Sequence, residues 1–395
     1  MEINKAYEGR EHSLIKHELL KGYLETLLYI VGVSGIRELV YVDCFAGPWG
    51  DETDSLSGTS IAISLDIPSK VRNTLAKVHR IHGTKFRAIY IEETKKRYKL
   101  LSRYLTRNCP DGIECHALHG DYSKLQDEIL QLCGDNGFAF FFIDPLGWTD
   151  VGIPKLEKLL KRPKSEFLIT LMYDFFNRFK SKAALKNQVA DILGKLSDVE
   201  YAEIARLSPK ETEEFVVRKY RQQLKSAMGS VGSYHSRSYH AVVKDKSKER
   251  TKYHLVYVTR HHKGIVKFAE ASGKAEFFQH IVRIQAKQNA TGQVSLFDPE
   301  VEAKQLDDAR VEIEDVKRYW LTKLSDKPAV FDEARLADML EETGWLIGDF
   351  QLAFGQLLHE KKVENMDAIR QRKTQYVHFH KNERLRSCND NHKQD

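Results

Sequence analysis

The stretch Tyr41–Gly50, "YVDCFAGPWG", joins an apolar strand-like run to an acid and a turn with two glycines. Gly47 and Gly50 would let the backbone approach a ligand closely. A phosphate-binding loop would need a lysine after the glycines, whereas "GPWGDETD" offers acids. We therefore expect a ligand that carries an amino group or hydroxyls, with a tight bend before a helix as the structural alternative.

Strand-like and helix-like segments alternate on both sides of this turn. The strand-like runs are "ELVYVD", "FRAIYIEE", "IECHALHGD", "GFAFFFIDP" and "EFLITLMYD", each followed by a helix-like run. This alternation predicts an α/β fold with a mostly parallel sheet and helices on both faces. "SYHAVV" and "KYHLVYVTR" predict a terminal hairpin. The set fits a class I methyltransferase-like (Rossmann-like) sheet better than a simple dinucleotide-binding fold.

The length of 395 residues suits two domains. Residues 1–285 are expected to form the α/β domain, with an N-terminal helix over 12–31 and a helical insertion near 181–228. The polar stretch "AKQNATGQVSLFDPE" predicts a linker over 286–309. Three helix-like runs and two strand-like runs, "KVEN" and "TQYVHF", then predict a winged-helix-like domain over 310–385, followed by a polar tail over 386–395.

Composition narrows the class of protein. The five cysteines form no C-x-x-C pair, which argues against a zinc site and fits reduced thiols; no metal site is expected. The N-terminus is too polar for a secretory signal and "FAFFFI" is too short for a membrane span, so we expect a cytoplasmic protein. Net charge is +6, and basic clusters at 155–164, 244–252 and 370–373 are either solvated faces or sites for an anionic partner.

Acids close each of the strand-like runs. In an open parallel sheet, ligands bind beyond the carboxyl ends of the strands. Acids gathered there suit S-adenosylmethionine, which carries an amino group and a ribose diol. The acids are Asp43, Glu92, Asp121, Asp144 and Asp174.

The cofactor prediction assigns a part of the ligand to each acid. Asp43, with Phe45, Gly47 and Gly50 of the same turn, would hold the methionine end. Glu92 would accept the two ribose hydroxyls and Asp121 the adenine amino group. Helix capping is the alternative for both of these acids. A nicotinamide cofactor is disfavoured because the turn reads G-x-x-G and the second acid comes too late.

The run "IDPLGW" (Ile143–Trp148) offers the reacting groups. Asp144 or the carbonyl of Pro145 could accept a hydrogen bond from a target amine, and Trp148 could stack on a planar base. The alternative is an ordinary turn with a core tryptophan.

"MYDFFNRF" brings Asp174, Asn177 and Arg178 to the next strand end. We expect these three side chains to contact substrate, with core or capping roles as the alternative.

These motifs, in this order, resemble class I S-adenosylmethionine-dependent methyltransferases and, more closely, the three-Cys-motif partner (TcmP) family. The matching segments include "KHELLKGYL", "DCFAGPWG", "IDPLGW", "MYDFFNRF" and "TRHHKG", within residues 12–285. The D-P-x-G run also resembles that of tRNA guanine dimethyltransferases. Two positions depart from the pattern: Trp49 lies within the glycine turn, and Leu146 stands where an aromatic is usual.

The resemblance implies an N-methyltransferase that acts on a nucleobase amine in DNA or RNA. It also implies an alternative, a non-catalytic partner of a three-Cys-motif, radical-enzyme-like protein with a role in phage defence. In the winged-helix-like domain, Arg370, Arg372 and Lys373 are expected to contact nucleic acid phosphates, or the domain serves protein interaction.

Overall fold

The computed structural model describes residues 11–47, 59–173, 186–291 and 298–388. Two compact units divide the chain between His261 and His262.

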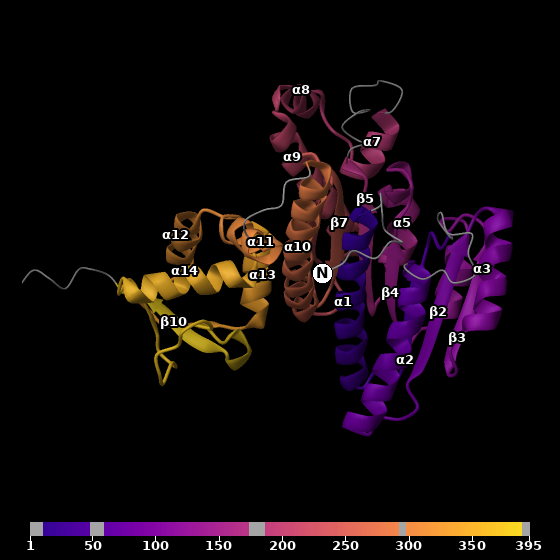
Figure 1. The fold of residues 1–395 in the computed structure, drawn as a ribbon, viewed down its shortest axis with the longest axis horizontal. Coiled ribbons are helices and arrows are strands. Elements are labelled where there is room, and N and C mark those ends of the chain that lie inside the picture. The colour runs from indigo at the N-terminus through magenta and orange to yellow at the C-terminus, as the bar shows by residue number, and fades with distance from the viewer. Residues whose placement is uncertain (1–10, 48–58, 174–185, 292–297, 389–395) are drawn as a thin grey trace, which may run out of the picture. The chain divides into compact units, whose positions relative to one another are not determined.

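Seven strands form one sheet in the first unit (Figure 1). They are β1 (Glu38–Asp43), β2 (Lys85–Glu92), β3 (Ile113–His119), β4 (Phe138–Ile143), β5 (Ser165–Leu171), β6 (Arg237–Lys244) and β7 (Thr251–Thr259). Their order is β3-β2-β1-β4-β5-β7-β6, and β7 runs antiparallel to both of its neighbours while the other pairs are parallel. This is the strand order of class I methyltransferases, so the predicted fold class is confirmed for this unit.

Helices cover both faces of the sheet. The helices of this unit are α1 (Glu11–Val33), α2 (Ser60–His79), α3 (Lys95–Asn108), α4 (Gln126–Cys133), α5 (Ile153–Leu160), α7 (Lys186–Leu193), α8 (Asp198–Arg206) and α9 (Pro209–Met228), with a 3-10 turn η2 (Thr149–Val151). α1 packs on α2 over one face, and right-handed crossovers place α3 on that face too. α4, α5 and α9 pack over the other.

The central strands are buried on both faces, as their apolar runs predict. Phe141 of β4 stacks on Phe167 of β5 at 4.8 Å between ring centroids. On the α1 face, Tyr23 lies 5.9 Å from Phe140. This packing fixes the carboxyl ends of β1 and β4 side by side, where the strand order reverses direction.

The second unit starts with a 30-residue helix, α10 (His262–Thr291). It continues with α11 (Pro299–Asp308), α12 (Ile313–Lys323), β8 (Ala329–Phe331), α13 (Glu333–Thr343), α14 (Ile347–His359), β9 (Val363–Asn365), η4 (Phe379–Lys381) and β10 (Glu383–Ser387). The three strands form an antiparallel sheet in the order β8-β10-β9. The order of helices and strands is compatible with a winged helix, which stays a prediction.

Three boundaries differ from the sequence-based expectation. The first unit ends at His261 rather than at 285, because α10 packs on α11 and α13 of the second unit. The described parts of the expected linker, 286–291 and 298–309, are mostly helical. The last strand of the ribbon is Glu383–Ser387, which runs into the expected tail, and "TQYVHF" forms no strand.

Cys109 and Cys115 form a disulfide, so the expectation of five reduced thiols is wrong for this pair. The bend between the end of α3 and the start of β3 brings their Cα atoms to 6.2 Å, which is within bonding range. Cys44 is a buried core residue, as expected. None of the described helices is both long enough and apolar enough to cross a membrane.

Candidate functional site

The carboxyl ends of β1 to β4 lie at one edge of the sheet. The register pairs Asp43 with Tyr90 and with Phe142, and Glu92 with His119. The backbone N–H of Cys44 donates to Phe142 O, while Ala46 donates to Ile91 O. The strand ends therefore bring together four of the five predicted acids: Asp43, Glu92, Asp121 and Asp144.

Asp43 shapes the turn after β1 from a fully buried position. One carboxylate oxygen accepts from the Phe45 backbone N–H at 3.1 Å, and the other accepts from the Ser60 hydroxyl at 2.7 Å. Burial raises the pKa of Asp43 to about 6, against the lowering effect of these hydrogen bonds. Asp43 thus ties β1 to the start of α2, and in this state its carboxylate does not reach the surface.

Glu92 is 6% exposed and has one oxygen engaged. Its Oε1 accepts from the Thr94 backbone N–H at 2.6 Å, just before α3. In the described part of the chain, Oε2 accepts no hydrogen bond and is available for a hydroxyl.

Asp121 is half-buried and organises the turn before α4. Its Oδ1 accepts from both the backbone N–H and the hydroxyl of Ser123, at 2.9 and 2.8 Å. This is an Asx turn rather than the helix N-cap that was the alternative for Asp121, because α4 begins at Gln126 and its N-cap position is Leu125. In the same region, the ring of Phe45 packs on Tyr122 at 5.1 Å, and Gly47 donates to Phe45 O at 2.9 Å.

Asp144 forms an ion pair with Lys16 of α1. The side chains are 18% and 9% exposed, so the pair is largely shielded from water. Lys16 binds the Oδ2 atom, whereas Oδ1 is buried and has no hydrogen-bond partner among the described residues. A buried acceptor without a donor is costly, which marks Asp144 Oδ1 as a site for a ligand N–H.

Two further side chains surround this pair. Lys16 Nζ lies 5.6 Å from the centroid of the Tyr253 ring, and Tyr253 donates its hydroxyl proton to His12 O at 2.6 Å. Burial, together with the charges of Lys252 and Lys16, lowers the pKa of His12 to about 4. His12 is therefore neutral at pH 7, and Lys16 supplies the positive charge next to Asp144.

Sequence reasoning did not assign a role to Lys16, His12 or Tyr253. Lys16 lies 128 residues from Asp144 in the chain. One signal was present: Lys16 sits between the buried Ile15 and Leu19 on the apolar side of α1. A lysine on a buried helix face needs a carboxylate partner.

Trp148 does not present its ring to a base. It is 5% exposed and belongs to the hydrophobic core under the sheet, so the alternative of a core tryptophan holds in this state. Leu146 is instead the exposed side chain of the loop, at 62%. Pro145, which precedes Leu146, is buried.

Five positions of interest lie outside the described residues. They are Trp49 and Gly50 in the glycine turn, and Asp174, Asn177 and Arg178 after β5. Their expected roles stay predictions.

Arg372 is not free to bind a phosphate. Its guanidinium pairs with the carboxylate of Glu383, with donor–acceptor distances of 2.8 and 2.5 Å, and also donates to Tyr376 O. Glu383 is 3% exposed, so this pair holds the loop between β9 and β10 together. Of the three basic residues predicted there, Arg370 and Lys373 are exposed.

The "TRHHKG" motif is explained by the buried Arg260. Its guanidinium donates to the backbone carbonyls of Leu160, Arg162, Met228 and Gly229, at 2.6–3.2 Å. These carbonyls lie at and just beyond the ends of α5 and α9, which leaves them without helical partners. Arg260 therefore joins β7 to two helix ends and does not face the candidate site.

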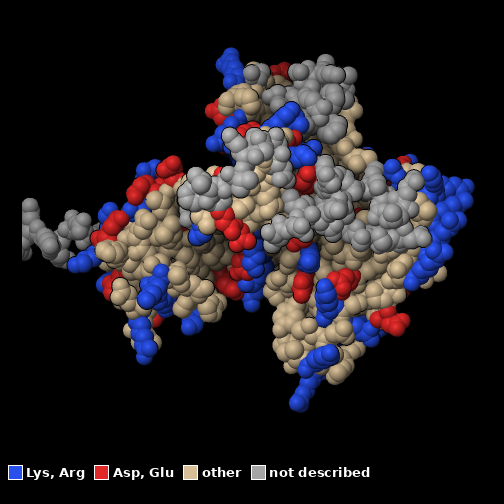
Figure 2. All heavy atoms as spheres, viewed as in Figure 1, with Lys and Arg blue, Asp and Glu red and all other residues tan. Residues whose placement is uncertain are grey.

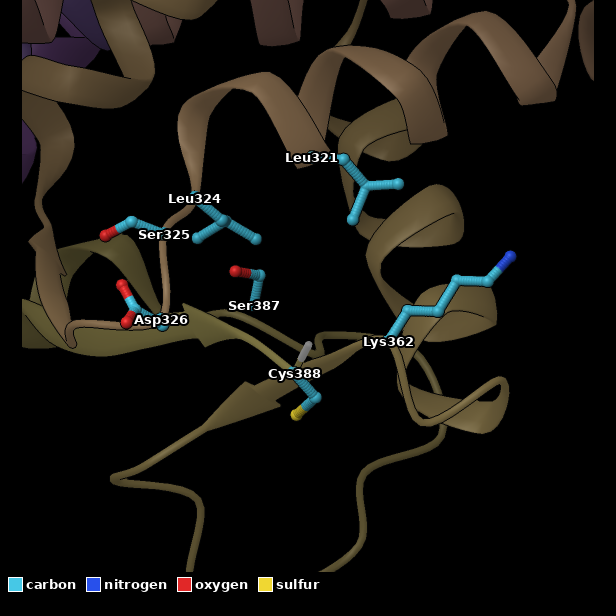
Figure 3. A pocket seen from close by; sticks show the side chains of 7 residues that line it. All are labelled: Leu321, Leu324, Ser325, Asp326, Lys362, Ser387 and Cys388. Atoms are coloured by element: carbon cyan, nitrogen blue, oxygen red, sulfur yellow. The ribbon is translucent and has the colours of Figure 1, made fainter. Parts of the chain in front are cut away.

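A surface pocket of about 520 Å³ occurs in the second unit. Figure 3 shows Ser325, Asp326, Ser387 and Cys388 around it, with Lys362 directed outward. Lys362 pairs with Glu360 at 2.8 Å. This pocket has one carboxylate, Asp326, whereas four gather at the strand ends. We therefore place the candidate site at the carboxyl ends of the strands.

No protein-family model and no curated protein matches the sequence. Among solved structures, a Legionella pneumophila protein has a TM-score of 0.33 at 11% identity, over 62% of this chain and 85% of that one. Loganic acid methyltransferase with S-adenosylhomocysteine (SAH) has a TM-score of 0.30 at 10% identity, over 74% and 88%. An O-methyltransferase of Bacillus cereus with SAH has 0.28 at 13%, over 60% and 79%. At these scores the fold assignment rests on the strand order described above.

Proposed function

We propose that this protein is an S-adenosylmethionine-dependent N-methyltransferase that acts on a nucleobase amine in nucleic acid. The observation that carries the proposal is Asp144, which directly follows β4 next to the switch point. One of its oxygens pairs with Lys16, and the other is buried and has no partner in the part of the chain that the structure describes. A carboxylate held in this way accepts an N–H of an exocyclic amine and aims its lone pair.

The residues present fit this cofactor. Glu92 keeps one oxygen available for a ribose hydroxyl, and the turn held by Asp43 offers no lysine that would bind a phosphate. When bound, the cofactor supplies an electrophilic methyl group. The chain's own contribution is positional: Asp144 holds the amine, Lys16 compensates the carboxylate charge, and the bend at Pro145 fixes the loop.

The proton released from the methylated nitrogen must leave the site. In this proposal Asp144 Oδ1 receives it, and Lys16 keeps its interaction with Oδ2. Trp148 supports the loop from the core and contributes no stacking surface.

The test is a transfer assay with S-adenosylmethionine labelled in the methyl group. The wild-type protein is incubated separately with transfer RNA, ribosomal RNA and DNA, and the nucleosides are analysed by mass spectrometry. We expect a gain of one methyl on an amino-bearing base, and a loss of at least 100-fold in rate for Asp144→Asn with unchanged cofactor affinity. If the cofactor binds but no nucleic acid is methylated, the alternative of a non-catalytic partner protein gains support.

A further inference from the structure

Helix α3 (Lys95–Asn108) carries a basic charge that its own sequence does not balance. The helix "KKRYKLLSRYLTRN" has six Lys and Arg residues and no acid. Figure 2 shows Lys and Arg side chains gathered over α3, at the edge of the sheet next to β3. Sequence reasoning treated this segment only as a helix.

Four of these basic residues form one stripe, since they recur every fourth residue. All four are exposed, and a rise of about 1.5 Å per residue spreads them over roughly 18 Å. The stripe consists of Lys95, Lys99, Arg103 and Arg107.

None of these four residues forms an ion pair with any described residue. The cluster on and just after α5 behaves differently: Lys155 pairs with Asp150 at 2.7 Å, and Lys158 and Lys161 pair with Asp127 and Glu157. Local acids therefore neutralise a cluster that the sequence had marked as basic, while the stripe stays unbalanced.

The arrangement also costs α3 stability. Lysines at 95 and 96 lie in the first turn, where the helix dipole disfavours positive charge. Like charges four residues apart repel by about 0.2–0.5 kcal/mol a pair. A helix that keeps such charges without acids has a surface suited to an anionic partner.

The apolar side of α3 identifies the kind of partner. Leu101 and Leu105 are 0% and 5% exposed, because they pack between the helix and the sheet. A helix that binds a membrane surface needs its apolar face free to enter the lipid. A row of exposed cations on a rigid rod fits the phosphates of a nucleic acid backbone instead.

We propose that the α3 stripe binds the sugar-phosphate backbone of the nucleic acid that presents the target base. This inference rests on the proposed function. The position of α3 agrees with this inference. The helix begins three residues after Glu92, at the carboxyl ends of the strands, where Asp144 also lies. The stripe would hold the strand while the flexible base reaches the site, without reading its sequence.

The experiment measures binding of a fluorescein-labelled 30-nucleotide RNA, the same sequence as single-stranded DNA, and a DNA duplex by anisotropy from 50 to 200 mM NaCl. The stripe variant is Lys99→Gln/Arg103→Gln/Arg107→Gln. Glutamine keeps the helix propensity, and the three positions avoid the neighbourhood of Glu92. The matched control, Lys155→Gln/Lys158→Gln/Lys161→Gln, removes the same charge from paired lysines.

We expect the stripe variant to bind its preferred nucleic acid at least tenfold more weakly at about 100 mM salt, with a salt slope lower by two to three. The control should stay within about threefold of wild type, and thermal unfolding should show that both variants are folded. Equal affinities of wild type and stripe variant, or equal losses in both variants, would overturn the inference and leave the methyl-transfer proposal standing. No binding of nucleic acid by wild type would overturn both. If the stripe variant binds nucleic acid as wild type does but loses binding to anionic lipid vesicles, the stripe belongs to a membrane surface and the inference is overturned.

Discussion

Lys16 of α1 and Asp144 at the end of β4 form a shielded ion pair across 128 residues of sequence. The pair joins the N-terminal helix to the switch point of the sheet. It leaves the other carboxylate oxygen buried and without a hydrogen-bond partner among the described residues. The N-terminal helix is thus part of the candidate site as well as a cover for the sheet.

Replacement of Lys16 by methionine should reduce catalysis more than cofactor binding. The variant keeps most of the length of the side chain but leaves the Asp144 charge uncompensated, so we expect kcat to fall at least tenfold with cofactor Kd within about threefold of wild type. Lys16→Arg should recover part of kcat. Equal kcat for wild type and Lys16→Met would show that the pair has no role in positioning.

The same pair can be measured in a stability cycle. We expect Lys16→Met to lower the free energy of unfolding by about 2 kcal/mol, because half of a shielded pair is left behind. Adding Asp144→Asn should restore much of this loss. Additive effects of the two substitutions in urea unfolding would indicate that the pair contributes no coupling.

Asp43 should make stability depend on pH. Its folded pKa of about 6 lies above the ordinary value of 3.8, so the folded state holds the proton more tightly. Its contribution to stability is therefore full below pH 4 and is lost as pH rises to about 6. Asp43→Asn should gain about 2–3 kcal/mol relative to wild type between pH 4 and pH 7. A difference in urea unfolding that stays constant over this range would contradict the assignment.

Arg372 should stabilise its unit rather than bind nucleic acid. Burial would raise the pKa of Glu383, but hydrogen bonds from Arg372, the His378 N–H and Asn365 hold this pKa at about 2. We expect Arg372→Ala to cost about 2–4 kcal/mol at pH 7, and less as pH falls from 4.5 toward 2.

The neighbouring Arg370→Ala is the control for this prediction. Arg370 is exposed, so its replacement should change stability by less than about 0.5 kcal/mol. A stable Arg372→Ala variant with weakened nucleic-acid binding would reverse our interpretation.

The sequence predicted the strand ends well because continuous apolar runs and terminal acids have local causes. "FAFFFI" predicts a buried strand. Asp43, Glu92 and Asp144 each stand at the end of such an apolar run, so their place at a strand end could be predicted from the sequence. Side-chain partners were harder to predict, since they depend on tertiary contacts. The pairing of Lys16 with Asp144 joins distant segments, and the burial of Trp148 depends on how the loop folds over the core.

Basic clusters show the same limit. "KLEKLLKRPK" and "KKRYKLLSRYL" look equally basic in the sequence. The structure separates them, because the lysines of the first meet acids from their own helix and from neighbouring segments, while four basic residues of the second meet none among the described residues. Charge in a sequence therefore predicts a surface, and only the fold shows whether that surface is already neutralised.

The central claim is that the carboxyl edge of the sheet binds S-adenosylmethionine, and isothermal titration tests it most directly. The wild-type protein is titrated beside Glu92→Gln, with Glu93→Gln as the control because Glu93 is exposed and next in sequence. We predict binding by wild type and the control, and an affinity 10- to 100-fold lower for Glu92→Gln. Glutamine is neutral and has one acceptor oxygen, which the Thr94 N–H occupies, so the charged acceptor for the ribose hydroxyl is lost. Absence of binding by wild type, or full affinity in Glu92→Gln, would contradict the account.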